Sequence, residues 1–267
     1  MMDSLNLEKF KVEVERDIRF MINIRSKEEI QKMTKAATVV RDLLNDIEGI
    51  IKPGVSTIEL DTYAENFINK QGAIPGFKGL YGFPSTLCVS INDEVVHGIP
   101  SNRMLNDGDI IGIDVGSIVD GFYGDHAKTF PVGSISDDNK KLINVTKECL
   151  IKGIEQARPG NRIGDIGFAI QTHAESFGYG VVKELVGHGI GEKLHEEPQI
   201  PNYGLQNTGP IIEKGMCFAI EPMINFGSEE IYTKSDNWTI CTKDGSASAH
   251  FEHTITIGEE GAQILTI

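Results

Sequence analysis

Four segments of the chain carry apolar residues at every third or fourth position, which is the spacing of an amphipathic helix. They are residues 27–51, 57–71, 137–158 and 163–177. Ser26 followed by Glu29 forms a capping box, so the first helix is predicted to begin directly after Ser26. Residues 1–20 are charged and weakly periodic, and we interpret them as a peripheral extension to a single domain of residues 21–267.

Shorter segments are rich in β-branched and aromatic residues, and several are bounded by Gly or Asp-Gly turns, which predicts antiparallel strands. These segments are residues 86–92, 109–119, 126–133, 178–185, 215–224, 237–242 and 248–257. Groups of strands alternate with pairs of helices along the chain. We therefore expect an α+β fold, in which the helices cover the outer face of a curved antiparallel sheet.

The two predicted helix pairs resemble one another, because residues 43–68 and 150–175 both place Pro-Gly between two helical segments. A helix cannot continue through Pro-Gly, so each copy is predicted to be a helix–turn–helix unit. Chance similarity of two amphipathic helix pairs is the alternative to duplication. The matched positions are Pro53 with Pro159, Gly54 with Gly160, Ile58 with Ile163 after a one-residue slip, and Asp61 with Asp165.

The repeat extends to two carboxylates, which favours duplication. Asp114 lies 61 residues after Pro53, and Glu221 lies 62 residues after Pro159. Two similar halves that each deliver carboxylates from strands would place a site on a pseudo-two-fold axis between them.

Composition narrows the classes of function. The chain has 267 residues, of which 40% are hydrophobic, and this is enough for a substantial core. A net charge of −14 argues against nucleic acid as a partner, because phosphate binding requires a basic surface. The four cysteines lack both CxxC pairs and the spacing of a disulfide framework, which predicts a reducing, cytoplasmic location. We expect no signal peptide and no membrane span, since no apolar run approaches the ~20 residues that a membrane helix requires. No feature of the sequence requires an oligomer, so we expect a monomer.

Asp114 and Asp125 are candidate metal ligands that flank a predicted hairpin turn. Asp120-Gly121 lies between them at nearly equal distance from each, and this dipeptide is typical of a tight turn. Residues placed opposite or diagonally on one face of a hairpin have Cβ atoms ~4.5–8 Å apart. Either aspartate alone could be a solvated turn residue. Asp114, however, interrupts the apolar run IIGIDVG, where an unpaired buried carboxylate would be costly without a cation.

Three further residues complete a candidate set of metal ligands. Glu221 lies inside the apolar segment CFAIEPMI, and strand alternation places Glu252 on one face with His250 and Thr254. His188 lies between glycines in GHGIG, where a flexible loop with an incidental histidine is the alternative. Four carboxylates and one imidazole exceed the four ligands usual for zinc, so a site for two divalent ions that activates water for hydrolysis is predicted.

The ordered set of motifs resembles that of the type I methionine aminopeptidases from about Met21 to the C-terminus. The matching motifs are NDEVVHGIP, GIDVG, GFYGD, GHGIG, LHEEPQIPNYG, AIEPM and FEHT. The resemblance implies the pita-bread fold, with pseudo-two-fold symmetry and one catalytic domain. It also implies removal of the N-terminal methionine from new polypeptides, which the enzyme could meet at the ribosome. The carboxylate-rich ligand set with one imidazole suits two divalent ions of cobalt, manganese, iron or zinc and does not determine which of them is bound.

The resemblance also implies individual roles. Asp114 would bind one ion, His188 and Glu221 the other, and Asp125 and Glu252 would bridge them, with hydroxide between the ions as the nucleophile. His195 would donate a hydrogen bond to the scissile carbonyl, His97 would contact the substrate near the departing nitrogen, and Glu221 would shuttle a proton. The implied methionine pocket consists of Phe77, Phe83, Cys88 and Trp238, while Leu80 and Leu194 stand where the family usually has aromatic residues.

Several alternatives remain at this point. Taken alone, His97 and His195 could be surface histidines, and Phe83 and Cys88 could be ordinary core residues. Prolidases and Xaa-Pro aminopeptidases share the implied fold but carry an additional N-terminal domain. Type II methionine aminopeptidases carry an insertion, for which the 33 residues from His188 to Glu221 leave no room. A non-catalytic binding module of the same fold would lose metal ligands, and all five candidates are present here.

Overall fold

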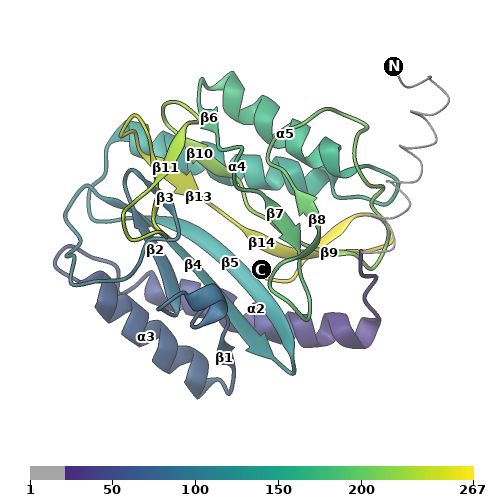
Figure 1. Cartoon of the computed structure of the whole chain (residues 1–267), viewed down its shortest axis with the longest axis horizontal. Coiled ribbons are helices and arrows are strands. Elements are labelled where there is room, and N and C mark those ends of the chain that lie inside the picture. The colour runs from purple at the N-terminus through teal and green to yellow at the C-terminus, as the bar shows by residue number, and fades with distance from the viewer. Residues whose placement is uncertain (1–21) are drawn as a thin grey trace.

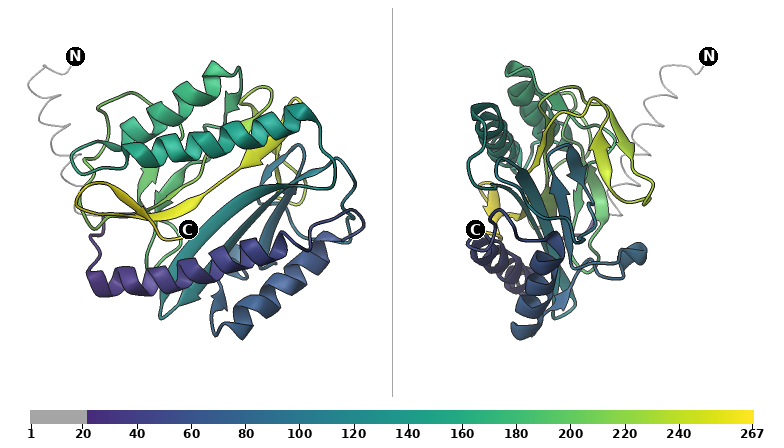
Figure 2. Two further views of the ribbon diagram at one scale, coloured as in Figure 1. Left: turned by 180° about the vertical axis from the view of Figure 1, so that it is seen from behind. Right: turned by 90° about the vertical axis from the view of Figure 1, so that its left-hand side faces the viewer.

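The computed structural model describes residues 22–267, so the interpretation of residues 1–20 as an extension lies outside the described residues. Two pairs of helices lie on one side of the molecule and strands on the other (Figures 1 and 2). The predicted α+β architecture with helices on an outer face is confirmed. Among the described residues, no helix is both long and apolar enough to span a membrane.

The helices begin and end close to the predicted residues. They are α2 (Lys27–Ile47), α3 (Thr57–Lys70), α4 (Asp137–Gln156) and α5 (Ile163–Ser176), with one 3₁₀ turn, η1 (Leu80–Gly82). The predicted capping box is present at the start of α2. The Glu29 carboxylate accepts from the Ser26 amide at 2.8 Å, and the Ser26 hydroxyl accepts from the Glu29 amide at 3.3 Å.

The strands are antiparallel throughout the described ladders and form four hydrogen-bonded sheets rather than one. One sheet contains β1 (Ile74–Pro75), β2 (Leu87–Ile91), β4 (Ile110–Val119) and β5 (Phe122–Pro131). A second contains β7 (Gly187–Gly189), β8 (Glu196–Ile200), β9 (Cys217–Ile220), β14 (His253–Ile257) and β15 (Ala262–Ile264). The two small sheets contain β6 (Gly180–Val181), β10 (Met223–Asn225) and β13 (Ser248–His250), and β3 (Glu94–Val96), β11 (Ile231–Thr233) and β12 (Ile240–Thr242).

Each helix pair covers its own hydrophobic core. Residues of α2 and α3 pack with β2, β4 and β5, and residues of α4 and α5 pack with β9 and β14. The Pro-Gly turns make equivalent backbone contacts. The Gly54 amide donates to the Leu105 carbonyl at 2.8 Å, and the Gly160 amide donates to the Ile212 carbonyl at 3.0 Å. These paired contacts support the predicted duplication.

The match of Asp61 with Asp165 is wrong, because the structure aligns the two copies without a slip. Glu59 and Asp165 occupy the same position in the first turns of α3 and α5, and each accepts a hydrogen bond from the amide three residues earlier. Asp61 has a different task, since its carboxylate accepts from the amides of Thr86 and Leu87 at the start of β2.

The two strands predicted over residues 215–224 and 248–257 are each interrupted at a glutamate. β9 pairs with β14 through Ile220 and His253, and β10 pairs with β13 through Met223 and His250. These pairs share one register, which places Glu221 opposite Glu252 in the gap between the ladders. The ladder opens because Pro222 has no amide hydrogen and because the Glu252 amide donates instead to Ala127 of β5, at 3.0 Å.

Candidate metal centre

All five predicted metal ligands line one pocket, which has a volume of about 130 Å³. Asp114 and Asp125 come from the hairpin β4–β5, where Asp125 pairs with Gly116 and Asp114 pairs with Ala127. The two aspartates are therefore diagonal neighbours on one face, as the turn signal predicted. Asp120 and Gly121 form that turn with φ values of 51° and 81°, which suit a tight hairpin.

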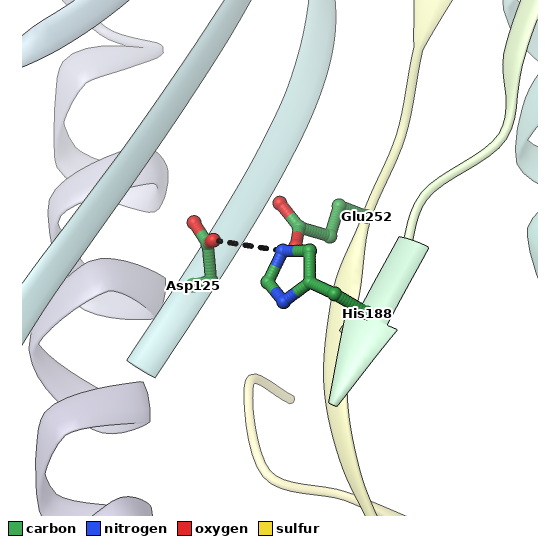
Figure 3. Close-up of side chains that lie close together, drawn as sticks. All are labelled: Asp125, His188 and Glu252. Atoms are coloured by element: carbon green, nitrogen blue, oxygen red, sulfur yellow. Dashed lines mark ion pairs between the residues drawn. The ribbon is translucent and has the colours of Figure 1, made fainter. Parts of the chain in front are cut away.

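Three of the five residues form a close cluster. One ligand atom from each of Asp125, His188 and Glu252 lies within 4.8 Å of the others (Figure 3). The His188 Nδ1 atom lies 3.0 Å from the Gly189 carbonyl oxygen, so it donates there and leaves Nε2 free to face the carboxylates. His188 Nε2 is 3.6 Å from Glu221 and 3.9 Å from Asp125, which adds Glu221 to the cluster as its third carboxylate.

The carboxylates lie close together without the partners that buried charges need. Burial raises the pKa of Asp114 to about 7, and burial followed by repulsion from nearby carboxylates raises the pKa of Asp125 and Glu252 well above the usual range. One oxygen atom each of Asp114, Asp125 and Glu252 is buried with no hydrogen-bond partner among the described residues. Carboxylate oxygens without hydrogen-bond partners, next to an imidazole nitrogen that is free to bind, are suitable ligands for divalent cations.

Glu221 differs from the other three carboxylates. Burial alone would raise its pKa, but a hydrogen bond from His250 and the nearby imidazole of His188 outweigh burial and lower the pKa below its usual value. Glu221 is therefore the carboxylate in this cluster that the protein itself keeps ionised. Strand alternation places His250 on the same face as Glu252 but does not identify it as a neighbour of Glu221.

The two histidines implied to contact substrate also line the pocket. His97 directly follows β3. The next residue, Gly98, lies so close to β2 that an added Cβ would be 2.0 Å from the Val89 carbonyl oxygen, and this contact fixes the backbone beside His97. Burial lowers the pKa of His97. Partial burial and the neighbouring His188 lower the pKa of His195 to about 4, although the residue is exposed on the pocket rim. Both imidazoles are therefore neutral at pH 7. The ring of Tyr81 stacks on His195 at 5.9 Å between centroids.

The part of the pocket lining away from the carboxylates is apolar. Phe77, Phe83 and Cys88 are buried, and Trp238 meets Phe83 edge to face at 5.1 Å. Leu80 and Leu194, the two departures from the family pattern, lie in the same wall and keep it apolar. The structure thus brings together every residue predicted for the site, with Cys88 held as a neutral thiol because burial raises its pKa.

The remaining histidines lie outside the pocket lining. His126 Nδ1 lies 2.6 Å from the Glu252 carbonyl oxygen, and its ring stacks on His253 behind the site. His173 pairs with Glu148 at 2.8 Å between α4 and α5. All three imidazoles therefore make contacts outside the pocket rather than with the side chains of the candidate ligands.

Buried carboxylates around an imidazole at the base of an apolar pocket define a candidate metal-dependent hydrolase. The chain belongs to metallopeptidase family M24, whose family model matches residues 31–259. It is 54% identical over 246 residues to methionine aminopeptidase 1 of Bacillus subtilis, which covers 92% of this chain and 99% of that relative. The resemblance inferred from the motifs is confirmed.

Solved structures agree with the sequence relatives. The crystal structure of methionine aminopeptidase from Rickettsia prowazekii is 44% identical, with a TM-score of 0.91, and the match covers 92% of this chain and 100% of that one. A prolidase from Pyrococcus horikoshii shares the fold with a TM-score of 0.76 at 23% identity, but this chain covers only 64% of it. The predicted pita-bread fold is thus confirmed.

Proposed function

We propose that this protein removes the N-terminal methionine from polypeptides in a hydrolysis that depends on bound divalent metal. The observation that carries the proposal is the set of buried, unpartnered carboxylate oxygens at the base of an apolar pocket. The high identity to methionine aminopeptidases over nearly the whole chain supports the choice of substrate.

Asp114, Asp125, His188, Glu221 and Glu252 would hold two ions. Bound divalent ions supply Lewis acidity, which lowers the pKa of water and polarises a carbonyl oxygen. Five donors, four of them carboxylates, are more than one ion requires, and the set suits manganese, iron(II), cobalt or zinc.

The chain's own groups act on the substrate around this centre. Neutral His195 can donate a hydrogen bond to the carbonyl oxygen of the methionine residue as negative charge develops there. His97, which lines the same pocket as Glu221, can contact the nitrogen of the departing peptide. Glu221 stays ionised and can accept a proton and pass it to the leaving amine.

The apolar wall would select the methionine side chain. Phe77, Phe83 and Trp238 offer aromatic surface to an unbranched thioether, which makes favourable contacts with aromatic rings. Cys88 adds a small, neutral sulfur to the same wall. Four free, buried cysteines support a reducing, cytoplasmic location. The enzyme would act there as a monomer on new polypeptides.

An assay of peptide hydrolysis tests the proposal. Methionine should be released from Met-Gly-Ser peptides, release should stop with a chelator, and a divalent metal should restore it. Release only from Xaa-Pro peptides would instead assign the chain a prolidase-like specificity. No hydrolysis with any of the four metals would favour a binding module.

A further inference from the structure

The imidazole of His250 faces one oxygen of the Glu221 carboxylate, and the imidazole of His188 faces the other. The His250 side chain is buried, with a relative exposure of 4%, and its Nε2 atom lies 3.4 Å from Glu221 Oε2. His188 Nε2 lies 3.6 Å from the other oxygen, Oε1. Each oxygen of this carboxylate therefore has its own imidazole.

The strand register explains how His250 reaches this position. Met223 pairs with His250 in the ladder β10–β13, so Glu221 and His250 are diagonal neighbours beside the gap in the strand pair. His250 Nε2 is buried and has no aligned hydrogen-bond partner among the described residues. A buried nitrogen of this kind is expected to be satisfied by the acceptor that it faces.

The backbone at His250 is held by other groups. The Thr129 hydroxyl accepts from the His250 amide and donates to the His250 carbonyl, both at 2.9 Å. This contact fixes β13 against β5 without help from the imidazole. The side chain is therefore available for a task in the site.

We propose that His250 is a positioning residue for Glu221, whose Oε2 accepts from the His250 Nε2–H group so that Oε1 remains directed toward the ion beside His188. Groups that hydrogen-bond a metal ligand fix its orientation, and removing them typically weakens metal binding ~10–100-fold. This inference rests on the proposed metal site and adds a residue that does not itself bind the ion.

The test is a titration of full-length, metal-free protein with Co(II), followed by calorimetry and by the visible absorption of the bound ion. His250→Leu should weaken binding of one ion by ~10–100-fold and alter its absorption. His250→Gln, which keeps an N–H donor, should restore most of the affinity. Wild-type affinity in the leucine variant, or equal losses in both variants, would overturn the proposal.

A double variant separates positioning from direct ligation. In a Glu221→Gln background, His250→Leu should cause little further loss of Co(II) affinity, because the group through which it acts has already changed. A full additional loss would instead identify His250 as a ligand and refute the positioning role.

His173→Leu is the matched control, because it removes an imidazole from a histidine–glutamate pair far from the pocket. It should bind Co(II) like wild type. Thermal unfolding of the metal-free variants checks that they fold, and His250→Ala replaces the leucine variant if that one does not. The titration needs no hydrolysis, so failure to release methionine would contradict only the proposed function.

Discussion

Two threonines hold residues of the candidate metal centre where β5 lies against the interrupted strand of residues 248–257. The Thr254 hydroxyl donates to the Asp125 carbonyl at 2.8 Å and accepts from the Asp125 amide at 3.0 Å. Thr129 makes the same pair of bonds with His250. Threonine hydroxyls thus replace backbone–backbone hydrogen bonds between these strands. They hold the backbone of Asp125 and His250 in place and leave the side chains of both residues free.

His195→Ala should lower kcat for methionine release by roughly 10²–10³-fold, the loss expected when a donor to a developing oxyanion is removed. The imidazole is neutral at pH 7 because its pKa lies at about 4, so it can donate without carrying charge. Steady-state kinetics measures the effect, and elemental analysis should find unchanged metal content. Loss of metal from this variant would show that His195 is a ligand.

Asp125→Asn should stabilise the metal-free protein at pH 8 while it prevents metal binding and activity. Because the pKa of Asp125 is raised in the folded state, its stabilising contribution is present below the ordinary pKa of ~3.9 and is lost as pH rises toward the folded value. Asparagine has no such dependence, so the gain in Tm should grow from pH 4 to pH 8. Thermal unfolding in chelator measures it, and a lower Tm than wild type at pH 8 would contradict it.

At the scale of elements, β5 lies directly against α2. An added Cβ at Gly124 would lie 2.4 Å from the Ala37 amide nitrogen of α2, and backbone atoms cannot move aside as a side chain can. This close approach fixes the position of β5 relative to α2, and with it the position of Asp125, the next residue.

Gly124→Ala should therefore lower the free energy of unfolding by about 1–3 kcal/mol, the range for overpacking a tight interface, and should also weaken Co(II) binding. Gly112→Ala on β4 is the control, since its nearest contact would be an ordinary 3.6 Å. Urea unfolding and metal titration measure both effects. Equal stability of the two variants would argue against the close approach.

Sequence patterns were most informative for long, periodic elements. The helices were predicted to within a few residues because their apolar spacing and the cap at Ser26 are local signals. The breaks at Glu221 and Glu252 were missed because they depend on β5, which takes the Glu252 amide from a distant part of the chain. The strand at His188 was missed because its flanking glycines resemble a loop.

The candidate site was predicted better than the strands that carry it. Asp114 and Glu221 could be selected from the sequence because each is a charged residue within an apolar run. The roles of the individual residues came from the resemblance of the motifs to the family. No role was predicted for His250, because strand alternation indicates which face of the strand a side chain lies on but not which residue it contacts. Its relation to Glu221 requires the pairing of β10 with β13.

At the scale of the whole molecule, the candidate metal centre lies between two similar halves. Asp114 and Asp125 come from the half that contains α2 and α3, while His188, Glu221 and Glu252 come from the half that contains α4 and α5. Each half has its own core. Bound ions would therefore add contacts between the halves that neither core provides.

Removing metal should lower the Tm of the whole protein. A ligand at 100 times its Kd stabilises the folded state by about 2.7 kcal/mol, and relief of carboxylate repulsion acts in the same direction. Calorimetry with and without chelator measures the shift, and Mn(II) or Co(II) should reverse it. His173→Leu should show the same shift, and an unchanged Tm after complete metal removal would contradict the prediction.

The gap in the strand pair also has a consequence for folding. Because side chains alternate along a strand, a slip of one residue in either ladder would turn Glu221 or Glu252 to the opposite face. Only the native register brings both glutamates to His188, so a mispaired chain has no site to fill. Metal binding would therefore be confined to molecules in which both ladders are correctly paired.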